Sequence, residues 1–211
     1  MKQNTLSANQ ARAVIYRLLG ACYYQPEAAF SEEDVFGQLQ EALAVLDDSL
    51  AEQAARLGKA FAAESLDELL LDYSRLFLGP FDILAKPYGS IYLEGEKVVM
   101  GDSTMDALAC YRQEDFVLSD DFREVPDHIA AELEFLYLLT FRENEALASG
   151  ENKRRAALAA LKTTFLQNHL GRWVPPFAAA LLQGAATDFY RLLAELTEGF
   201  IRKQSPRLAQ G

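Results

Sequence analysis

Apolar side chains recur at intervals of three and four along most of this chain, which is the spacing of one buried face of an α-helix. Val14, Leu18 and Cys22 form one such stripe. It is preceded by Ser7 with Gln10 three positions later, a pair typical of a capping box at a helix start. The pattern predicts about nine to ten helices. Their expected spans are 7–22, 31–46, 51–63, 65–77, 102–111, 126–150, 151–170, 176–183 and 186–202.

Polar and turn-forming residues indicate where several of these helices begin and end. Ser65 and Glu68 make a second capping box. Asp102 suits a helix start after a glycine, and Pro126 suits a first helical position, because the N–H that proline lacks would have no partner there. Gly171 is expected as a C-cap that ends one helix before the next begins. No alternation typical of a sheet is present, so the predicted class is all-α, with 1–211 as a single helical domain.

Residues 79–102 interrupt the helical pattern with two prolines and several glycines. We expect one long irregular loop here, and 90–93 could pair with 97–100 as a small hairpin. Loops of this length inside a compact domain tend to carry function. The segment is rich in apolar and aromatic residues. Two interpretations stay open: a lid packed on the core, or a platform of aromatic side chains beside a ligand groove.

A second interruption, acidic and irregular, precedes Pro126. It joins an N-terminal set of helices to a C-terminal set. The sequence therefore predicts two lobes, 1–113 and 127–211, connected by a proline-stiffened hinge at 114–126.

Composition narrows the possible partners. The chain has 211 residues, of which 50% are hydrophobic and 24% charged, a globular composition. The formal net charge of −11 argues against nucleic acid or an anionic membrane as a partner and favours a cationic one. The longest apolar stretch contains two prolines and is too short to cross a bilayer, and the N-terminus lacks the pattern of a secretory signal peptide. We therefore expect a cytoplasmic protein without an integral membrane segment.

Few residues here suggest catalysis. The chain lacks a phosphate-binding loop, a nucleophile elbow and an HExxH zinc motif. His128 and Glu132 are four apart on a predicted helix and share a face, so a small metal-dependent hydrolase centred on this pair is one alternative. The other is that such residues cap the helix and hold a neighbouring loop. The second histidine, His169, is expected at a helix C-terminus, where its charge would interact favourably with the helix dipole.

The same region is better suited to binding a polypeptide. Asp102 and Asp127 are candidate partners for arginine guanidinium groups. Tyr88 and Tyr92 offer ring faces to apolar or cationic side chains. An apolar groove with an acidic rim would accept a peptide that is hydrophobic and basic at one end.

Four short motifs follow one another along the chain. They are Tyr73-x-x-Leu76-Phe77-x-Gly79-Pro80, Pro87-Tyr88-Gly89-Ser90-x-Tyr92, Gly101-Asp102-Ser103, and Glu124-x-Pro126-Asp127-His128 with Glu132. In order and spacing, and over nearly the whole chain, they resemble the TorD/DmsD family of cytoplasmic chaperones for molybdoenzyme maturation. The resemblance implies a helical, non-enzymatic protein without a cofactor or metal of its own. Its partner would be the twin-arginine signal peptide of the apo-form of a molybdopterin-dependent oxidoreductase catalytic subunit, held in the cytoplasm until cofactor insertion.

The resemblance also implies which residues bind the peptide. They are Phe77, Pro87, Tyr88, Gly89, Ser90, Tyr92, Asp127 and His128. Several members carry tryptophan where this chain has Tyr88 and Tyr92, so its peptide preference is expected to differ. Some members form domain-swapped dimers, and a homodimer is therefore a further expectation. On this hypothesis Tyr88→Ala or Asp127→Ala weakens peptide binding and leaves thermal stability nearly unchanged.

Overall fold

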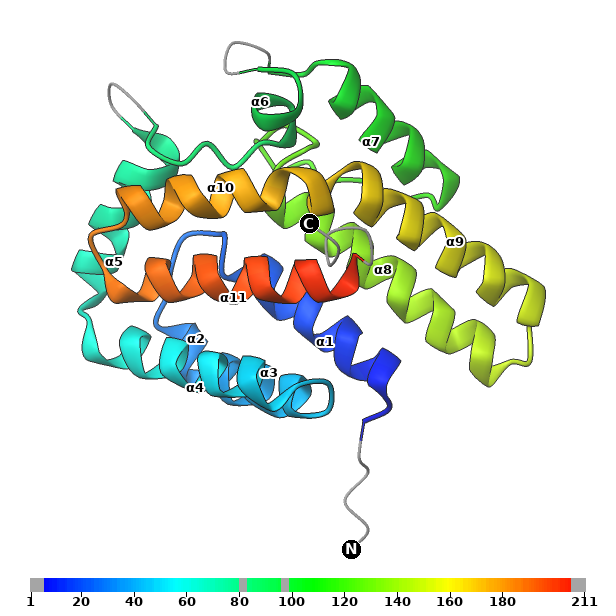
Figure 1. The fold of residues 1–211 in the computed structure, drawn as a ribbon, viewed down its shortest axis with the longest axis horizontal. Coiled ribbons are helices and arrows are strands. Elements are labelled where there is room, and N and C mark those ends of the chain that lie inside the picture. Colours follow the sequence, from blue (N-terminus) through cyan, green and yellow to red (C-terminus); the bar gives the residue numbers. More distant parts are fainter. Residues whose placement is uncertain (1–5, 80–82, 96–98, 206–211) are drawn as a thin grey trace, which may run out of the picture.

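The computed structural model describes residues 6–79, 83–95 and 99–205, and within these ranges the chain is helical (Figure 1). The elements are α1 (Ala8–Ala21), α2 (Ala29–Glu32), α3 (Val35–Ala44), α4 (Asp48–Ala63), α5 (Leu66–Tyr73), the π-helix η1 (Ser74–Leu78), α6 (Gly89–Leu93), α7 (Asp102–Gln113), α8 (Ile129–Ala148), α9 (Asn152–Asn168), α10 (Leu170–Gly184) and α11 (Asp188–Gln204). The all-α class is confirmed. The described ranges hold eleven α-helices, because the short α2 and α6 add to the predicted ones.

Helix ends follow the capping signals in part. Both capping boxes, at Ser7 and at Ser65, are present. The prediction for Gly171 was wrong: α9 ends at Asn168, and α10 begins at Leu170 and continues through both prolines. A Cβ at Gly171 would lie 2.4 Å from the backbone oxygen of Leu166, so glycine serves a close approach of the chain here rather than a helix end.

The helices share one hydrophobic core. Helix α1 packs along α8 and against α3, α4 packs against α3 and α11, and α10 packs against α9, α11 and α6 (Figure 1). Tyr16, Phe135, Trp173 and Phe189 are completely buried in this core. Helices from both sides of the expected hinge thus contact one another. The division into lobes at 1–113 and 127–211 stays a prediction.

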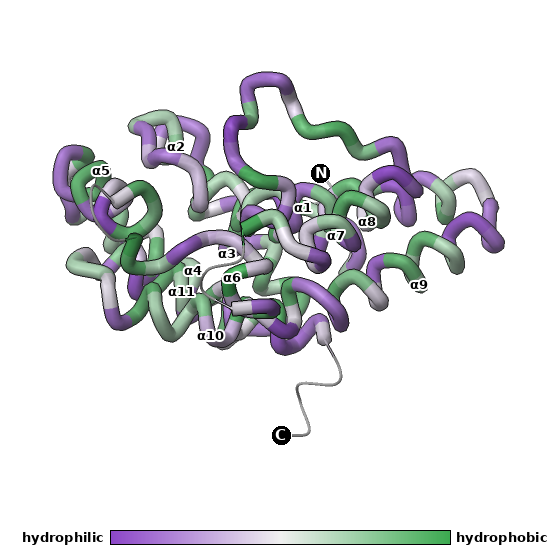
Figure 2. The backbone as a smooth tube through the Cα atoms, turned by 90° about the horizontal axis from the view of Figure 1, so that it is seen from above, coloured by the Kyte–Doolittle hydropathy of each residue, from purple (hydrophilic) through white to green (hydrophobic). Residues whose placement is uncertain are grey.

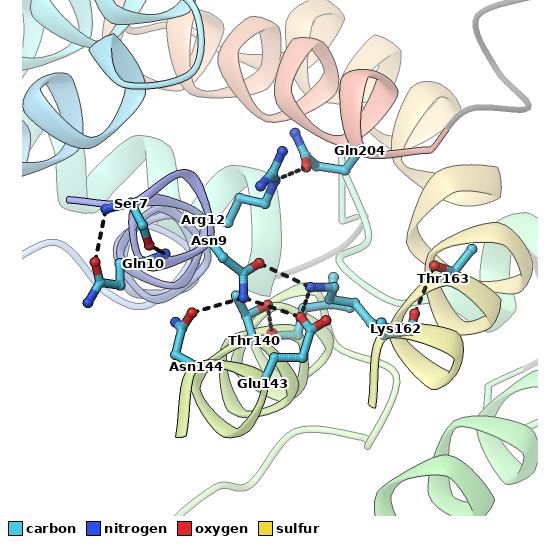
Figure 3. A network of polar contacts seen from close by, with 12 residues as sticks. Ser7, Asn9, Gln10, Arg12, Thr140, Glu143, Asn144, Lys162, Thr163 and Gln204 are labelled. Atoms are coloured by element: carbon cyan, nitrogen blue, oxygen red, sulfur yellow. Dashed lines mark hydrogen bonds and ion pairs between the residues drawn. The ribbon is translucent and has the colours of Figure 1, made fainter. Parts of the chain in front are cut away.

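A network of polar side chains fixes α1 against the C-terminal helices (Figure 3). The Asn9 amide on α1 donates to Asn144 on α8 over 3.0 Å. Glu143 on α8 forms an ion pair with Lys162 on α9, and both side chains are almost fully buried. Because a buried charge is costly without a partner, this pair constrains how the two helices lie.

The segment expected as an irregular loop contains a helix. Residues Gly89–Leu93 form α6, so the hairpin was wrong for its first arm, and part of the second arm lies outside the described residues. The carboxylate of Glu94, which follows α6, accepts hydrogen bonds from the backbone N–H groups of Asp102 and Ser103 at the start of α7. Glu94 therefore caps α7, a role that the sequence had assigned to Asp102. No helix in the described ranges is long and apolar enough to cross a membrane.

Candidate functional site

Two of the sequence motifs meet where α6 lies against the start of α8. The backbone N–H of Gly89 donates to the carbonyl of Asp127, and the N–H of Ile129 donates to the carbonyl of Pro87, both over 2.9 Å. This exchange makes an isolated antiparallel bridge between Tyr88 and His128. The segments are far apart in sequence, yet the backbone fixes them as one unit.

Asp127 holds the N-terminus of α6. Its Oδ2 atom accepts a hydrogen bond of 2.6 Å from the backbone N–H of Ser90, in the first turn of that helix. Free N–H groups at a helix start need such an acceptor, and a carboxylate also interacts favourably with the helix dipole. Asp127 is 1% exposed. Its carboxylate therefore supports α6 and does not face solvent. The sequence had led us to expect a carboxylate that binds an arginine of a partner directly.

The underside of α6 contacts Trp173 of α10. The Tyr92 ring stacks almost parallel to the indole, with centroids 5.9 Å apart. The indole N–H donates to Glu132 Oε2 over 3.0 Å. A Cβ at Gly89 would lie 3.0 Å from the indole nitrogen, so only glycine allows α6 to sit this close without a shift of the ring. The glycine of the motif thus serves the close approach of α6 to Trp173.

Glu132 and His169 form a buried polar pair below α6. Glu132 Oε1 lies 3.9 Å from His169 Nδ1. Burial raises the pKa of Glu132 well above its usual range and lowers the pKa of His169 to about 4. His169 is therefore neutral at pH 7, and its ring stacks on Phe165 with centroids 4.4 Å apart. The expected charge–dipole interaction at a helix C-terminus was wrong, because it requires a protonated ring.

His128 caps α8. Its Nδ1 atom accepts a hydrogen bond of 3.1 Å from the backbone N–H of Ala130, and burial lowers its pKa to about 3. Glu132 is engaged with Trp173, as described above. Across the residues that the structure describes, no three histidine, cysteine, aspartate or glutamate side chains gather in a way that could hold a metal ion. The geometry thus gives His128 and Glu132 structural contacts, and nothing in it favours the hydrolase alternative.

The predicted peptide-binding residues separate into buried and surface groups. Six of them are buried: Phe77, Pro87, Gly89, Ser90, Asp127 and His128. Only Tyr88 and Tyr92 are partly exposed. Phe77 packs in the core, where its ring contacts Tyr23 and Tyr190. The other five buried residues form the turn that carries Tyr88 and its contact with the start of α8.

A band of half-buried aromatic side chains runs from Tyr88 across the surface, and we call Tyr24, Tyr73, Tyr88 and Phe122 the aromatic band. The Tyr88 hydroxyl donates to Glu124 over 2.6 Å. Burial and the neighbouring Glu124 charge raise the pKa of Tyr73. Phe122 contacts the Tyr24 ring at a centroid distance of 6.4 Å. Three of the four rings lie outside the predicted set.

The sequence carried an uneven signal for these further residues. Tyr73 and Glu124 stand inside the motifs that resemble the TorD/DmsD family. Tyr24 falls just beyond an apolar helical stripe, where it was indistinguishable from core. Phe122 lies in the acidic connection and had no signal, because only the folded connection brings it to Tyr24.

Comparison with known proteins places this geometry in a family. Residues 35–179 match the family described as "Nitrate reductase delta subunit". The chain is 31% identical over 185 residues to the Tat proofreading chaperone DmsD of Salmonella typhi, an alignment that covers 87% of this chain and 84% of that protein. The chain belongs to the TorD/DmsD family. It is also 32% identical over 170 residues to the chaperone protein TorD of Vibrio parahaemolyticus, covering 80% of this chain and 76% of the other.

A solved structure supports the fold. The crystal structure of a putative redox enzyme maturation protein from Archaeoglobus fulgidus superimposes with a TM-score of 0.54 over 90% of this chain and 93% of that one, at 21% identity. At this identity the likeness concerns the fold alone. The resemblance of the motifs to TorD/DmsD proteins is thus confirmed, and the named relatives on which it rests are chaperones.

Proposed function

We propose that this TorD/DmsD protein binds the twin-arginine signal peptide of an apo-molybdoenzyme catalytic subunit and holds it in the cytoplasm until the molybdopterin cofactor is inserted. The chaperone names of its relatives, one of them a Tat proofreading chaperone, support this assignment. The single structural observation that carries it is the aromatic band beside Glu124. Half-exposed rings next to carboxylates offer surface to both the apolar and the basic part of such a peptide.

The proposed peptide contacts are Tyr88 and Tyr92, and the buried members of the predicted set position them. Tyr88 follows Pro87 and is pinned by the backbone bridge to His128. A ring held in this way loses little further conformational entropy when a peptide packs on it. The net charge of −11 also favours the encounter with a basic peptide end.

Calorimetry with a synthetic twin-arginine signal peptide tests both the function and the site. We expect the wild-type protein to bind, and we expect Tyr88→Ala to weaken binding about tenfold or more, as loss of an aromatic anchor does. Leu147→Ala, at an exposed apolar position near the end of α8, is the matched control and should bind as the wild type does. A wild-type protein that ignores several such peptides would contradict the function. Wild-type affinity in Tyr88→Ala would contradict only the site.

Two further assignments accompany this function as proposals. The protein acts as a binding partner and not as an enzyme, so peptide binding should need no added metal or cofactor. A homodimer is the second assembly to test, and sedimentation of the purified protein with and without peptide decides it. A single monomeric species at all concentrations would remove the dimer and leave the peptide site intact.

A further inference from the structure

A pocket opens where the connection between α7 and α8 meets helices α1 and α8. This connection arches away from the helices at the top of Figure 2. The pocket has a volume of about 400 Å³. Its lining comes from three parts of the chain: Arg17, Ala21 and Tyr24 at the end of α1, Phe116 in the connection, and Glu134, Tyr137 and Leu138 on α8. Most of this lining is aromatic or aliphatic.

Glu134 is the only carboxylate of this lining, and it lacks a cationic partner. Its Oε1 atom accepts a hydrogen bond of 2.7 Å from the Tyr24 hydroxyl. It forms no ion pair with any residue that the structure describes, although Arg17 stands at the exposed rim. A carboxylate can accept about four hydrogen bonds, so most of its capacity is unused. Partial burial raises its pKa, which reflects the cost of a desolvated charge without a counterion.

The walls of the pocket favour a guanidinium group among the possible cations. Tyr24, Phe116 and Tyr137 supply aromatic side chains around the carboxylate. A guanidinium is planar and weakly hydrated, stacks on aromatic faces, and donates paired hydrogen bonds to a carboxylate. An ammonium group is a compact and strongly hydrated charge, and it would lose more hydration on entering such a pocket.

The pocket is continuous with the proposed peptide surface. Tyr24 belongs both to the pocket and to the aromatic band, and its ring contacts Phe122. Phe122 in turn contacts the His128 ring at 5.9 Å, and His128 contacts Tyr88 at 5.7 Å. Tyr88 and Phe122 thus both pack against the buried His128 ring, and both are partly exposed, so the pocket at Tyr24 lies beside the proposed peptide surface.

We propose that this pocket binds one arginine side chain of the client peptide, with the Glu134 carboxylate as the guanidinium acceptor and Tyr24 as the residue that positions it. The inference rests on the proposed function, since that function supplies a peptide with adjacent arginines. It assigns the recognition of arginine to Glu134, a residue outside the sequence motifs, and not to the buried Asp127.

Substitution of Glu134 in a peptide titration tests the assignment. The probe is a fluorescent synthetic peptide with two adjacent arginines followed by a leucine-alanine stretch, measured by anisotropy. Glu134→Gln keeps the shape of the side chain and an acceptor for Tyr24, and we expect it to weaken binding about tenfold to a hundredfold, the effect of losing a charge-assisted hydrogen bond. Glu145→Gln makes the same charge change at an exposed position of the same helix and should change affinity less than about twofold.

Two further measurements test whether charge controls the affinity and whether the bound group is a guanidinium. Arg17→Gln removes the cation at the rim and is expected to strengthen binding, opposite in sign to Glu134→Gln. The two arginines of the probe are also replaced by lysine, one at a time. For the arginine that enters the pocket, the replacement should reduce the difference in affinity between the wild type and Glu134→Gln. If neither replacement reduces it, the pocket does not bind arginine.

Free arginine amide separates failure of the inference from failure of the function. It should shift the NMR signals of the Ala21 and Leu138 methyl groups in the wild type, and not in Glu134→Gln. Those shifts would support the pocket even if the long peptide did not bind, in which case only the proposed function falls. Peptide binding that is equal in the wild type and in Glu134→Gln, with no shifts from arginine amide, overturns the pocket and leaves the function standing.

Discussion

The carboxylate of Asp127 holds α6, and replacing it therefore tests the construction of the site. Asp127→Ala removes the acceptor 2.6 Å from the Ser90 N–H and leaves that donor, in the first turn of α6, buried without a partner. The backbone carbonyl of Asp127 still accepts from Gly89, so α6 is loosened and not released outright. The sequence led us to expect that Asp127→Ala leaves thermal stability nearly unchanged. From the structure we now expect this substitution to lower the free energy of unfolding.

The magnitude follows from the lost hydrogen bond. A hydrogen bond to a charged acceptor contributes about 1.5–3 kcal/mol, and a missing cap costs about 0.5–2 kcal/mol, so we expect Asp127→Ala to lose about 2–3 kcal/mol. For a chain of this length that corresponds to a drop in melting temperature of about 4–12 °C. Asp127→Asn should cost less, about 1 kcal/mol, because its amide oxygen can still accept from Ser90 and its nitrogen replaces an oxygen that has no hydrogen-bond partner among the described residues.

Urea unfolding of the three proteins, paired with peptide calorimetry, measures both effects. We expect stability and affinity to fall together, in the order wild type, Asp127→Asn, Asp127→Ala, since loosened α6 no longer presents Tyr88 and Tyr92. An Asp127→Ala protein with the wild-type urea midpoint would refute the capping argument. If it also failed to bind peptide, Asp127 would have to contact the peptide directly in a conformation with α6 displaced.

Three further substitutions examine other contacts. Gly89→Ala should cost about 1–3 kcal/mol by overpacking against the indole of Trp173, the only tryptophan in the chain, and its fluorescence should shift; an unchanged spectrum and midpoint would contradict the close approach. Burial lowers the pKa of His128 from 6.5 to about 3, so as the pH falls the unfolded chain takes up a proton before the folded one does, and the imidazole subtracts stability from about pH 6.5 downward. His128→Asn can still cap the helix and lacks this loss. Between pH 7 and pH 5 the free energy of unfolding, measured with urea, should therefore fall more steeply in the wild type than in His128→Asn, with an extra slope that approaches about 1.4 kcal/mol per pH unit; parallel pH profiles would refute the assignment. Lys162→Met should destabilise by about 3 kcal/mol because it leaves the Glu143 carboxylate buried without its cationic partner and with only the 3.5 Å hydrogen bond from the Asn9 amide. Adding Glu143→Gln should recover much of that loss; no recovery would show that packing, not charge, holds α9.

The sequence predicted those helices that bury one face and expose the other. The stripe on α1 and the capping boxes at Ser7 and Ser65 needed only local information, and all are present. The failures have tertiary causes. Residues 89–93 are too few to show a helical period, and α6 is stabilised by Asp127, 37 residues from Ser90 in the sequence. The prolines at 175 and 176 lie inside α10 because burial of that helix outweighs two missing backbone hydrogen bonds.

The location of the candidate site stays a prediction, and the structure shows that most of the side chains named for it are buried and do not face solvent. A motif of Gly, Ser, Asp and His indicates tight backbone contact as readily as ligand contact, and sequence does not separate the two. The structure favours backbone contact for Gly89, Ser90, Asp127 and His128, all of which are buried. Phe122, which is partly exposed, belongs to the aromatic band only because the acidic connection folds back and brings its ring to Tyr24. No hydrophobic period in the sequence predicts that fold of the connection.

The difference between buried residues that support the candidate site and partly exposed residues that could contact a peptide determines how mutational data on the protein are to be interpreted. Under the proposed function, replacing a buried residue such as Asp127 is expected to weaken peptide binding without loss of a direct contact, because Asp127 acts through α6, and to cost stability as well. Replacing a partly exposed residue such as Tyr88 or Glu134, each a proposed peptide contact, is expected to lower affinity at a smaller cost in stability, since solvent already reaches its side chain in the free protein. The ratio of binding loss to stability loss therefore distinguishes the two groups, whereas binding loss alone would assign contact to residues that only hold the site in shape.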